Sequence, residues 1–456
     1  MTAPGQGAIA APTRPFVRVR APEAAAAGGR WDALSVALGA YIVTAVGRTH
    51  QLVPAIEPLR ITLVSALLAI LFWAVTRERV RRLAPVMRLP LARWVIALAA
   101  WMVLTIPGAL WPGGAFQQVT DETAKATVMF VVVVAAVRGF ADVERFALAY
   151  LLSVGVYAGA VLARFSVGAP PSWRLARLYD YDANEFATLI VMCLPLVVYF
   201  AFRPGPAWRR VAAIASGAAL TVGFVWSGSR GGFLALLATG AFLLLRYQGI
   251  RSHVRVGAAI AITLAFFAAA NDTYWDKMRT ILAPKADYNV TAAQGRVQVW
   301  KRGLGYMFGH PILGVGAGNF PVAEGTISPL VLSARPNQGV KWSVSHNSFI
   351  QVGAELGLPG LVIFLGILGT GFAELWTLGR IGARRPGVRP PPEAQLAQAL
   401  TGSLIAFVVG GFFLSLAYRD LLFVLLALVA GLWKAAVMAG AVARPTHPRA
   451  PVPWSS

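Results

Sequence analysis

Three residues stand out because they can carry chemistry and lie beside apolar segments long enough to be buried in a membrane. His346 closes a long polar stretch and directly precedes an apolar segment. An imidazole at a boundary between membrane and water can exchange a proton with a substrate that is half lipid and half polar. Arg230, in Ser-Gly-Ser-Arg-Gly-Gly at 227–232, and Arg296, in Gln-Gly-Arg at 294–296, add guanidinium groups. These residue types predict proton transfer and anion binding.

Each of the three residues also has a structural interpretation. Arg230 lies between two apolar segments with almost no loop, where it either snorkels to the interface or faces a water-filled cavity or an anion. Arg296 is either a solvated loop residue or part of a phosphate site at the start of a helix. His346 can cap the next helix or pack at the interface, but the polar residues around it at 343–348 favour a functional role.

Two further charged positions are supporting candidates. Glu355 follows His346 by nine residues and can orient it, bind a sugar hydroxyl or be a buried, hydrogen-bonded carboxyl. Arg419 directly precedes Asp420 in a very tight predicted turn. The two residues can form a structural ion pair, or Arg419 can be a further contact for an anion.

Metal binding has little support in the sequence. Asp180 and Asp182 can hold a divalent cation, although N-capping of the following helix by Asp182 or Asn184 is favoured. Cys193 is the only cysteine, which excludes an internal disulfide and a cysteine-based zinc site. We therefore predict no metal ligands.

The composition predicts an all-α integral membrane protein. Apolar residues make up 57% of the chain, charged residues 13%, and the mean hydropathy is +0.63. The net charge of +22 does not indicate nucleic-acid binding, because the arginines lie in short clusters between apolar segments, as orientation signals do. We therefore expect the chain to be embedded in a lipid bilayer.

About twelve transmembrane helices are expected. The apolar segments lie at 32–48, 59–76, 92–110, 123–138, 141–163, 185–202, 208–226, 231–246, 254–271, 347–373, 394–416 and 418–439. With both termini in the cytoplasm, every short cytoplasmic loop carries at least two basic residues, whereas the opposite loop 111–122 has none. This asymmetry predicts an N-in, C-in topology.

The topology divides the chain into five parts. A disordered cytoplasmic tail at 1–30 lacks the apolar stretch of a cleaved signal peptide, and nine spans follow at 31–271. A long extracytoplasmic loop occupies 272–346, spans ten to twelve occupy 347–440, and a cytoplasmic tail occupies 441–456. The loop should be helical: the spacing of Val297, Trp300, Leu304 and Met307 predicts an amphipathic helix, and 272–282 predicts another.

Several motifs, taken in order, resemble one family. They are the run at 227–232, Gln-Gly-Arg at 294–296 followed by Trp300, the stretch 309–320, and Ser-His-Asn-Ser-Phe-Ile-Gln at 345–351 leading into Glu-Leu-Gly-Leu-Pro-Gly at 355–360. From about 215 to 375 the chain resembles the O-antigen ligase and O-antigen polymerase family of bacterial membrane glycosyltransferases. The N-terminal half is similar mainly in topology.

The resemblance implies an enzyme of the bacterial inner membrane with a large periplasmic loop. It implies transfer of a glycan from an undecaprenyl-pyrophosphate carrier to an acceptor hydroxyl, with inversion and without a metal or other cofactor. Arg230 and Arg296 then correspond to pyrophosphate ligands, and His346 to the catalytic residue acting on the acceptor. The acceptor is lipid A-core for a ligase or another lipid-linked glycan for a polymerase, and the ligase is slightly favoured.

A transporter for lipid-linked sugars or anions is the alternative from another class. Twelve spans and intramembrane arginines fit it. Against it, no inverted repeat relates the two halves, and the polar candidates cluster outside the bilayer midplane.

Overall fold

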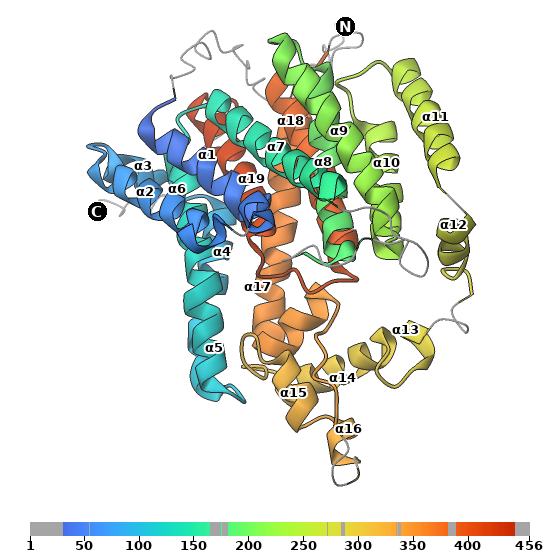
Figure 1. Cartoon of the computed structure of the whole chain (residues 1–456). Coiled ribbons are helices and arrows are strands. Elements are labelled where there is room, and N and C mark those ends of the chain that lie inside the picture. The colour runs from blue at the N-terminus through green and yellow to red at the C-terminus, as the bar shows by residue number, and fades with distance from the viewer. Residues whose placement is uncertain are drawn as a thin grey trace, which may run out of the picture.

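The computed structural model describes residues 31–53, 55–164, 175, 181–270, 272–283, 288–333, 335, 339–381 and 389–442. The predicted tail 1–30, most of the predicted tail 441–456 and Asp180 lie outside these ranges. Across the described ranges the chain is all helical and contains no β-strand (Figure 1). The predicted all-α class is therefore confirmed.

The helices of the first half follow the apolar segments closely. They are α1 (Ala33–Val46), α2 (Ile61–Val75), α3 (Arg79–Val86), α4 (Pro90–Thr105), α5 (Pro112–Gln118), α6 (Ala124–Ala136), α7 (Phe140–Arg164), α8 (Ala183–Phe202), α9 (Ala207–Ser227), α10 (Arg230–Arg246) and α11 (Ser252–Ala269). The second half adds α12 (Asp272–Arg279), α13 (Tyr288–Thr291), α14 (Arg296–Gly309), α15 (Phe320–Thr326), α16 (Pro329–Leu332), α17 (Ser348–Gly379), α18 (Pro392–Gly411) and α19 (Asp420–Met438).

Eight helices of the described chain are long and apolar enough to cross a membrane. These eight spans correspond to α2, α4, α7, α8, α9, α17, α18 and α19. The other four predicted segments coincide with α1, α6, α10 and α11, which are helical but are not among these eight. Of these, α1, α6 and α10 are shorter, with 14, 13 and 17 residues. A multi-pass membrane protein is therefore confirmed, and the count of twelve stays a prediction.

Burial separates central from peripheral helices. In α19, 83% of the most apolar 18-residue window is buried inside the protein, whereas for the span containing α2 the share is 11%. A helix that is apolar all round and wrapped by protein forms the core, and one that is apolar but uncovered faces lipid. The core is thus built around α19; α18 packs beside α19, and α8 packs against α18 and α9.

The helices α14, α15 and α16 gather around the first turns of α17, at one end of the bundle (Figure 1). We call this the loop end. The predicted amphipathic helix is confirmed as α14, and the predicted helix at 272–282 as α12. The buried side of α14 differs from the predicted one: Leu304 is 40% exposed, whereas Val299 and Gly303 are buried against Phe320. The glycine permits this rotation because its missing side chain lets Phe320 approach closely.

Two predicted boundaries were wrong. The eleventh segment was predicted to continue to 416, but α18 ends at Gly411. Beyond it, the Leu414 carbonyl and the Leu416 N–H form hydrogen bonds with the Ser348 hydroxyl, which they could not do within a continuous helix. The predicted loop 111–122 is helical: α5 continues through a π-helical turn, Val119–Thr123, into α6. A π turn inserts an extra residue without breaking the helix.

Candidate functional site

The linker between α18 and α19, residues 412–419, organises the candidate site. The Ser415 hydroxyl lies 2.8 Å from the Ser345 hydroxyl and accepts the backbone N–H of His346 at 2.9 Å. The Ser348 hydroxyl donates to the Leu414 carbonyl at 2.7 Å and accepts the Leu416 N–H at 2.9 Å. Two serines that precede or begin α17 therefore fix the linker against the residues around His346.

His346 is held in a strained backbone conformation. Its φ of 49° lies in the left-handed region, which residues other than glycine rarely adopt. Asn347, and not His346, caps α17, because its side chain accepts the N–H groups of Phe349 and Ile350. Capping is therefore excluded as the role of the half-buried imidazole. Strain of this kind is often kept where a side chain must be positioned for function.

The surroundings of His346 favour its neutral form. Burial lowers the pKa of the imidazole to about 4, and the positive charges of Arg296 and Lys341 act in the same direction. Asp182 opposes them and raises the pKa. Near neutral pH the ring therefore carries no charge and can accept a proton. Arg296 and Asp182 therefore both act electrostatically on His346.

Arg296 begins α14, directly after the N-cap residue Gly295. One turn later, the Trp300 indole N–H donates to the Ser345 carbonyl at 3.1 Å, and its ring lies 5.3 Å from Phe412 and 6.3 Å from Phe413, centroid to centroid. The first turn of α14 is thus fixed against both the linker and the residue before His346.

The start of α10, which carries Arg230, packs against the same linker. Ser229 caps α10 by accepting the Gly232 N–H at 3.1 Å, and Arg230 follows as the first helical residue. Its guanidinium donates to the Thr280 hydroxyl at 2.7 Å. A side chain at Gly231 would meet Phe413 of the linker at 3.1 Å, so this glycine allows α10 to pack closely there. Arg230, Arg296 and His346 therefore belong to three elements that meet at the linker.

Glu355 is placed as a structural carboxylate. It is 1% exposed and accepts the backbone N–H groups of Gly318 at 3.1 Å and Phe320 at 3.3 Å. Two residues later α17 kinks at Gly357, whose φ is 69°. These contacts join the kink of α17 to the start of α15, so Glu355 positions the elements around His346.

Arg419 pairs with a carboxylate that is distant in the sequence. Its guanidinium lies 3.7 Å from the Glu185 carboxylate. Asp420 lies 3.3 Å from Arg48. Glu185 in turn completes a capping box with Asp182, which confirms the predicted N-capping by Asp182. Arg419 therefore joins the linker to the start of α8.

Ser415 and Asp182 are the neighbours of His346 that the sequence did not assign to it. Ser415 was included in a predicted apolar span, although a serine after the two glycines at 410–411 was a signal that the helix ends there. Asp182 was considered for capping and for a cation, but nothing in its spacing related it to His346.

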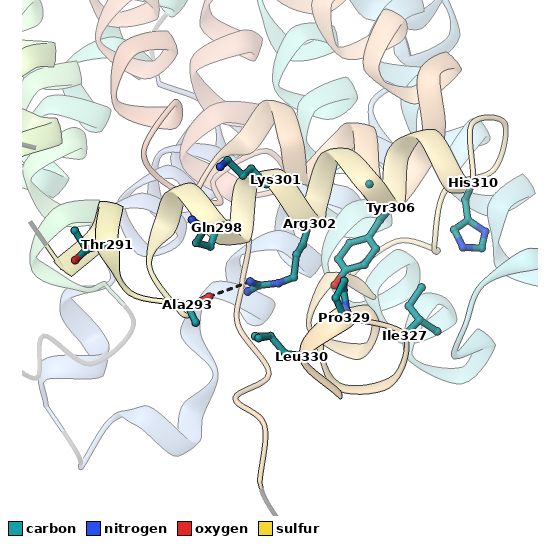
Figure 2. A pocket seen from close by; sticks show the side chains of 12 residues that line it. Thr291, Ala293, Gln298, Lys301, Arg302, Tyr306, His310, Ile327, Pro329 and Leu330 are labelled. Carbon is teal, nitrogen blue, oxygen red and sulfur yellow. Dashed lines mark hydrogen bonds between the residues drawn. The ribbon is translucent and has the colours of Figure 1, made fainter. Parts of the chain in front are cut away.

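A separate cavity of about 830 Å³ lies on another side of α14 (Figure 2). It is bordered by Lys301, Arg302 and Tyr306. The Arg302 guanidinium pairs with the buried Glu324 carboxylate at 2.6 Å, and the Tyr306 hydroxyl donates to the same carboxylate at 2.7 Å. This buried network fixes α14 to α15.

Replacing Arg302 with alanine is expected to destabilise the loop end. Glu324 is completely buried and would be left as an uncompensated charge, which costs about 3–5 kcal/mol. Hydrogen exchange of the α14–α16 region should show the loss, whereas Lys301→Ala, an exposed neighbour on the same helix, should not change it. Equal protection in the two variants would contradict a stabilising role for the ion pair.

A family model described as O-antigen ligase matches residues 215–365 of the 456. The matched segment contains Arg230, Arg296, His346 and Glu355 and ends before Arg419. A comparison with curated proteins finds no match to this chain.

Proposed function

Because residues 215–365 match the O-antigen ligase family model, we propose that this chain transfers a glycan from undecaprenyl pyrophosphate to an acceptor hydroxyl. One observation carries the proposal most directly: an imidazole kept neutral, fixed on a strained backbone and close to Arg296. Proton acceptance beside a cationic group is the combination that this reaction needs.

The proposed location is the periplasmic face of the bacterial inner membrane. The helix ends that meet at the linker lie at the loop end, which the arginine distribution assigns to the outside. In this arrangement α1, α6, α10 and α11 complete twelve spans, both termini are cytoplasmic, and 272–346 is the periplasmic loop. Donor glycans presented at the outer surface would thus reach His346 directly.

In the proposed reaction, the acceptor hydroxyl oxygen attacks the anomeric carbon of the donor sugar. The hydroxyl proton passes to the neutral imidazole of His346, and the bond between the anomeric carbon and the phosphate oxygen breaks. The electron pair of that bond leaves with undecaprenyl pyrophosphate. Attack on the side opposite the leaving group inverts the anomeric centre.

The leaving group requires positive charge more than it requires a proton. Arg230 and Arg296 begin α10 and α14, so each guanidinium group extends from a helix N-terminus, the end of a helix that favours an anion. Charge-assisted hydrogen bonds from these groups would stabilise the developing pyrophosphate charge. The two arginines would thus supply what a metal ion supplies in other transferases.

The same residues suit a polymerase that extends lipid-linked repeat units. The two activities differ in the acceptor, so purified protein should be given lipid-linked donor with either lipid A-core or a second lipid-linked glycan. Glycan attached to lipid A-core would support the ligase, and lengthened lipid-linked glycan the polymerase. Donor movement across vesicles without any new glycosidic bond would instead support a transporter.

The pH dependence of transfer should reflect the lowered pKa of His346. A base must be neutral, and an imidazole with a pKa of about 4 stays neutral as the pH falls from 7 to 5. We expect kcat/KM to decline only as the pH approaches 4, because kcat/KM reports the free enzyme. A decline centred near 6.5, the ordinary histidine pKa, would contradict the buried environment described above.

A further inference from the structure

A second cavity, of about 820 Å³, is lined in part by the linker residue Arg419 and is not used by the proposed mechanism. It is formed where α1 ends, where α2 and α19 begin, and along the start of α6. Its lining includes Arg48 and Arg60 at the ends of the α1–α2 connection, and Arg419 of the linker.

The lining has two chemically different parts. One part carries four cationic side chains and four carboxylates, among them Arg60, Lys125 and Glu57. The other part is apolar and comes from α2 and α6, where Leu67 is 56% exposed and Val128 is 46% exposed. Since α2 is largely uncovered by protein, this apolar wall faces the bilayer. A ligand with a polar head and an apolar chain matches both parts.

The polar part suits a sugar better than a simple anion. Equal numbers of cations and carboxylates give no large net charge, whereas a hydroxyl group can donate to a carboxylate and accept from a guanidinium. His50 and Gln51 also line the cavity, and within the described ranges the buried Nδ1 atom of His50 and the buried Oε1 atom of Gln51 have no hydrogen-bond partner. Buried polar atoms are normally satisfied, so each is a candidate partner for a ligand that fills the cavity.

Backbone strain marks the same place. Arg48 has a φ of 48° and Arg60 a φ of 45°, and both border the cavity. Within the described ranges, His346 is the third residue other than glycine with a positive φ. Strained residues persist where the surrounding structure holds them for a purpose.

The cavity is related to His346 through an ion pair, a helix cap and an electrostatic interaction. Arg419 lines the cavity and lies 3.7 Å from Glu185. Glu185 and Asp182 form the capping box of α8, and Asp182 interacts electrostatically with His346. A head group held by the polar part would therefore lie next to Arg419, which pairs with the capping box that acts electrostatically on the imidazole.

We propose that this cavity binds the acceptor as a membrane-embedded glycolipid, with its acyl chains against α2 and its sugars between Arg60 and Arg419. The inference rests on the proposed function, since it names the site of one of the two substrates. The donor pyrophosphate is held elsewhere, by Arg230 and Arg296. The cavity thus delivers the attacking hydroxyl from the side of α2.

The test uses the full-length protein in lipid nanodiscs with lipid A-core as the acceptor probe. Ala66→Trp fills the apolar part, and Arg60→Gln removes a charge from an exposed position of the polar part. Val64→Trp is the matched control, because Val64 is exposed on α2 and does not line the cavity. Acceptor binding is measured by native mass spectrometry without turnover, and donor binding is measured in parallel.

Both cavity variants should bind the acceptor about tenfold more weakly or worse, with donor binding unchanged, and Val64→Trp should resemble the wild type. Unchanged acceptor binding in both cavity variants, or a loss of donor binding instead, would overturn the proposal. Because binding is measured without turnover, an absence of transfer by the wild type would contradict the proposed function alone.

Discussion

Replacing His346 with alanine is expected to abolish glycan transfer while lipid-linked donor still binds. The imidazole is the base in the proposed reaction, and losing a general base typically lowers the rate by about 10²–10⁴-fold. The arginines that would hold the pyrophosphate begin α10 and α14 and are not altered by this change. Transfer and donor affinity should be measured on the same preparation.

The control variants separate chemistry from folding. Alanine is strained at the φ of 49° that His346 adopts, so His346→Asn provides a second variant, because asparagine tolerates this region better. Both should be inactive, whereas His310→Ala, at an exposed position after α14, should retain activity. Full transfer by His346→Asn would exclude the imidazole as the base.

Replacing either Arg230 or Arg296 with alanine should weaken donor binding and slow transfer. Each guanidinium is proposed to make charge-assisted hydrogen bonds to the pyrophosphate, worth about 1.5–3 kcal/mol, or roughly 10- to 150-fold in affinity. Lysine substitutions should recover part of the loss, because they keep the charge and lose the planar fork. Donor affinity can be measured with undecaprenyl pyrophosphate itself.

Arg279→Ala is the matched control for these variants. Arg279 is an exposed arginine of α12 that pairs with Asp276 on the surface, so its loss should leave donor affinity unchanged. If Arg230→Ala and Arg296→Ala both bind the donor as tightly as the wild type does, the pyrophosphate assignment is wrong.

The sequence was sufficient to predict the helices but not their meeting points. Apolar segments such as those of α7 and α8 define a membrane helix by composition, because lipid selects apolar side chains along the whole span. The end of α18 was missed because Phe412 and Phe413 are as apolar as the helix before them. What ends the helix there is a set of hydrogen bonds to Ser345 and Ser348, which are distant in the sequence.

The candidate site was predicted in part for the same reason. His346, Arg230 and Arg296 have unusual side chains for their apolar surroundings, so each could be selected from local context. Their common neighbour Ser415, and the proximity of Asp182 to His346, depend on long-range packing of α8, α17 and the linker. The rotation of α14 likewise depends on Phe320, which approaches Gly303 from another helix.

Glycan transfer by the purified protein is the most direct test of the proposed mechanism. Wild-type protein in liposomes, with lipid-linked donor, lipid A-core or a lipid-linked glycan as acceptor, and excess EDTA, should form a new glycosidic bond. His346→Asn under the same conditions should form none. Product that forms only after a divalent cation is restored, or that forms equally with His346→Asn, would contradict transfer by a neutral histidine and two arginines.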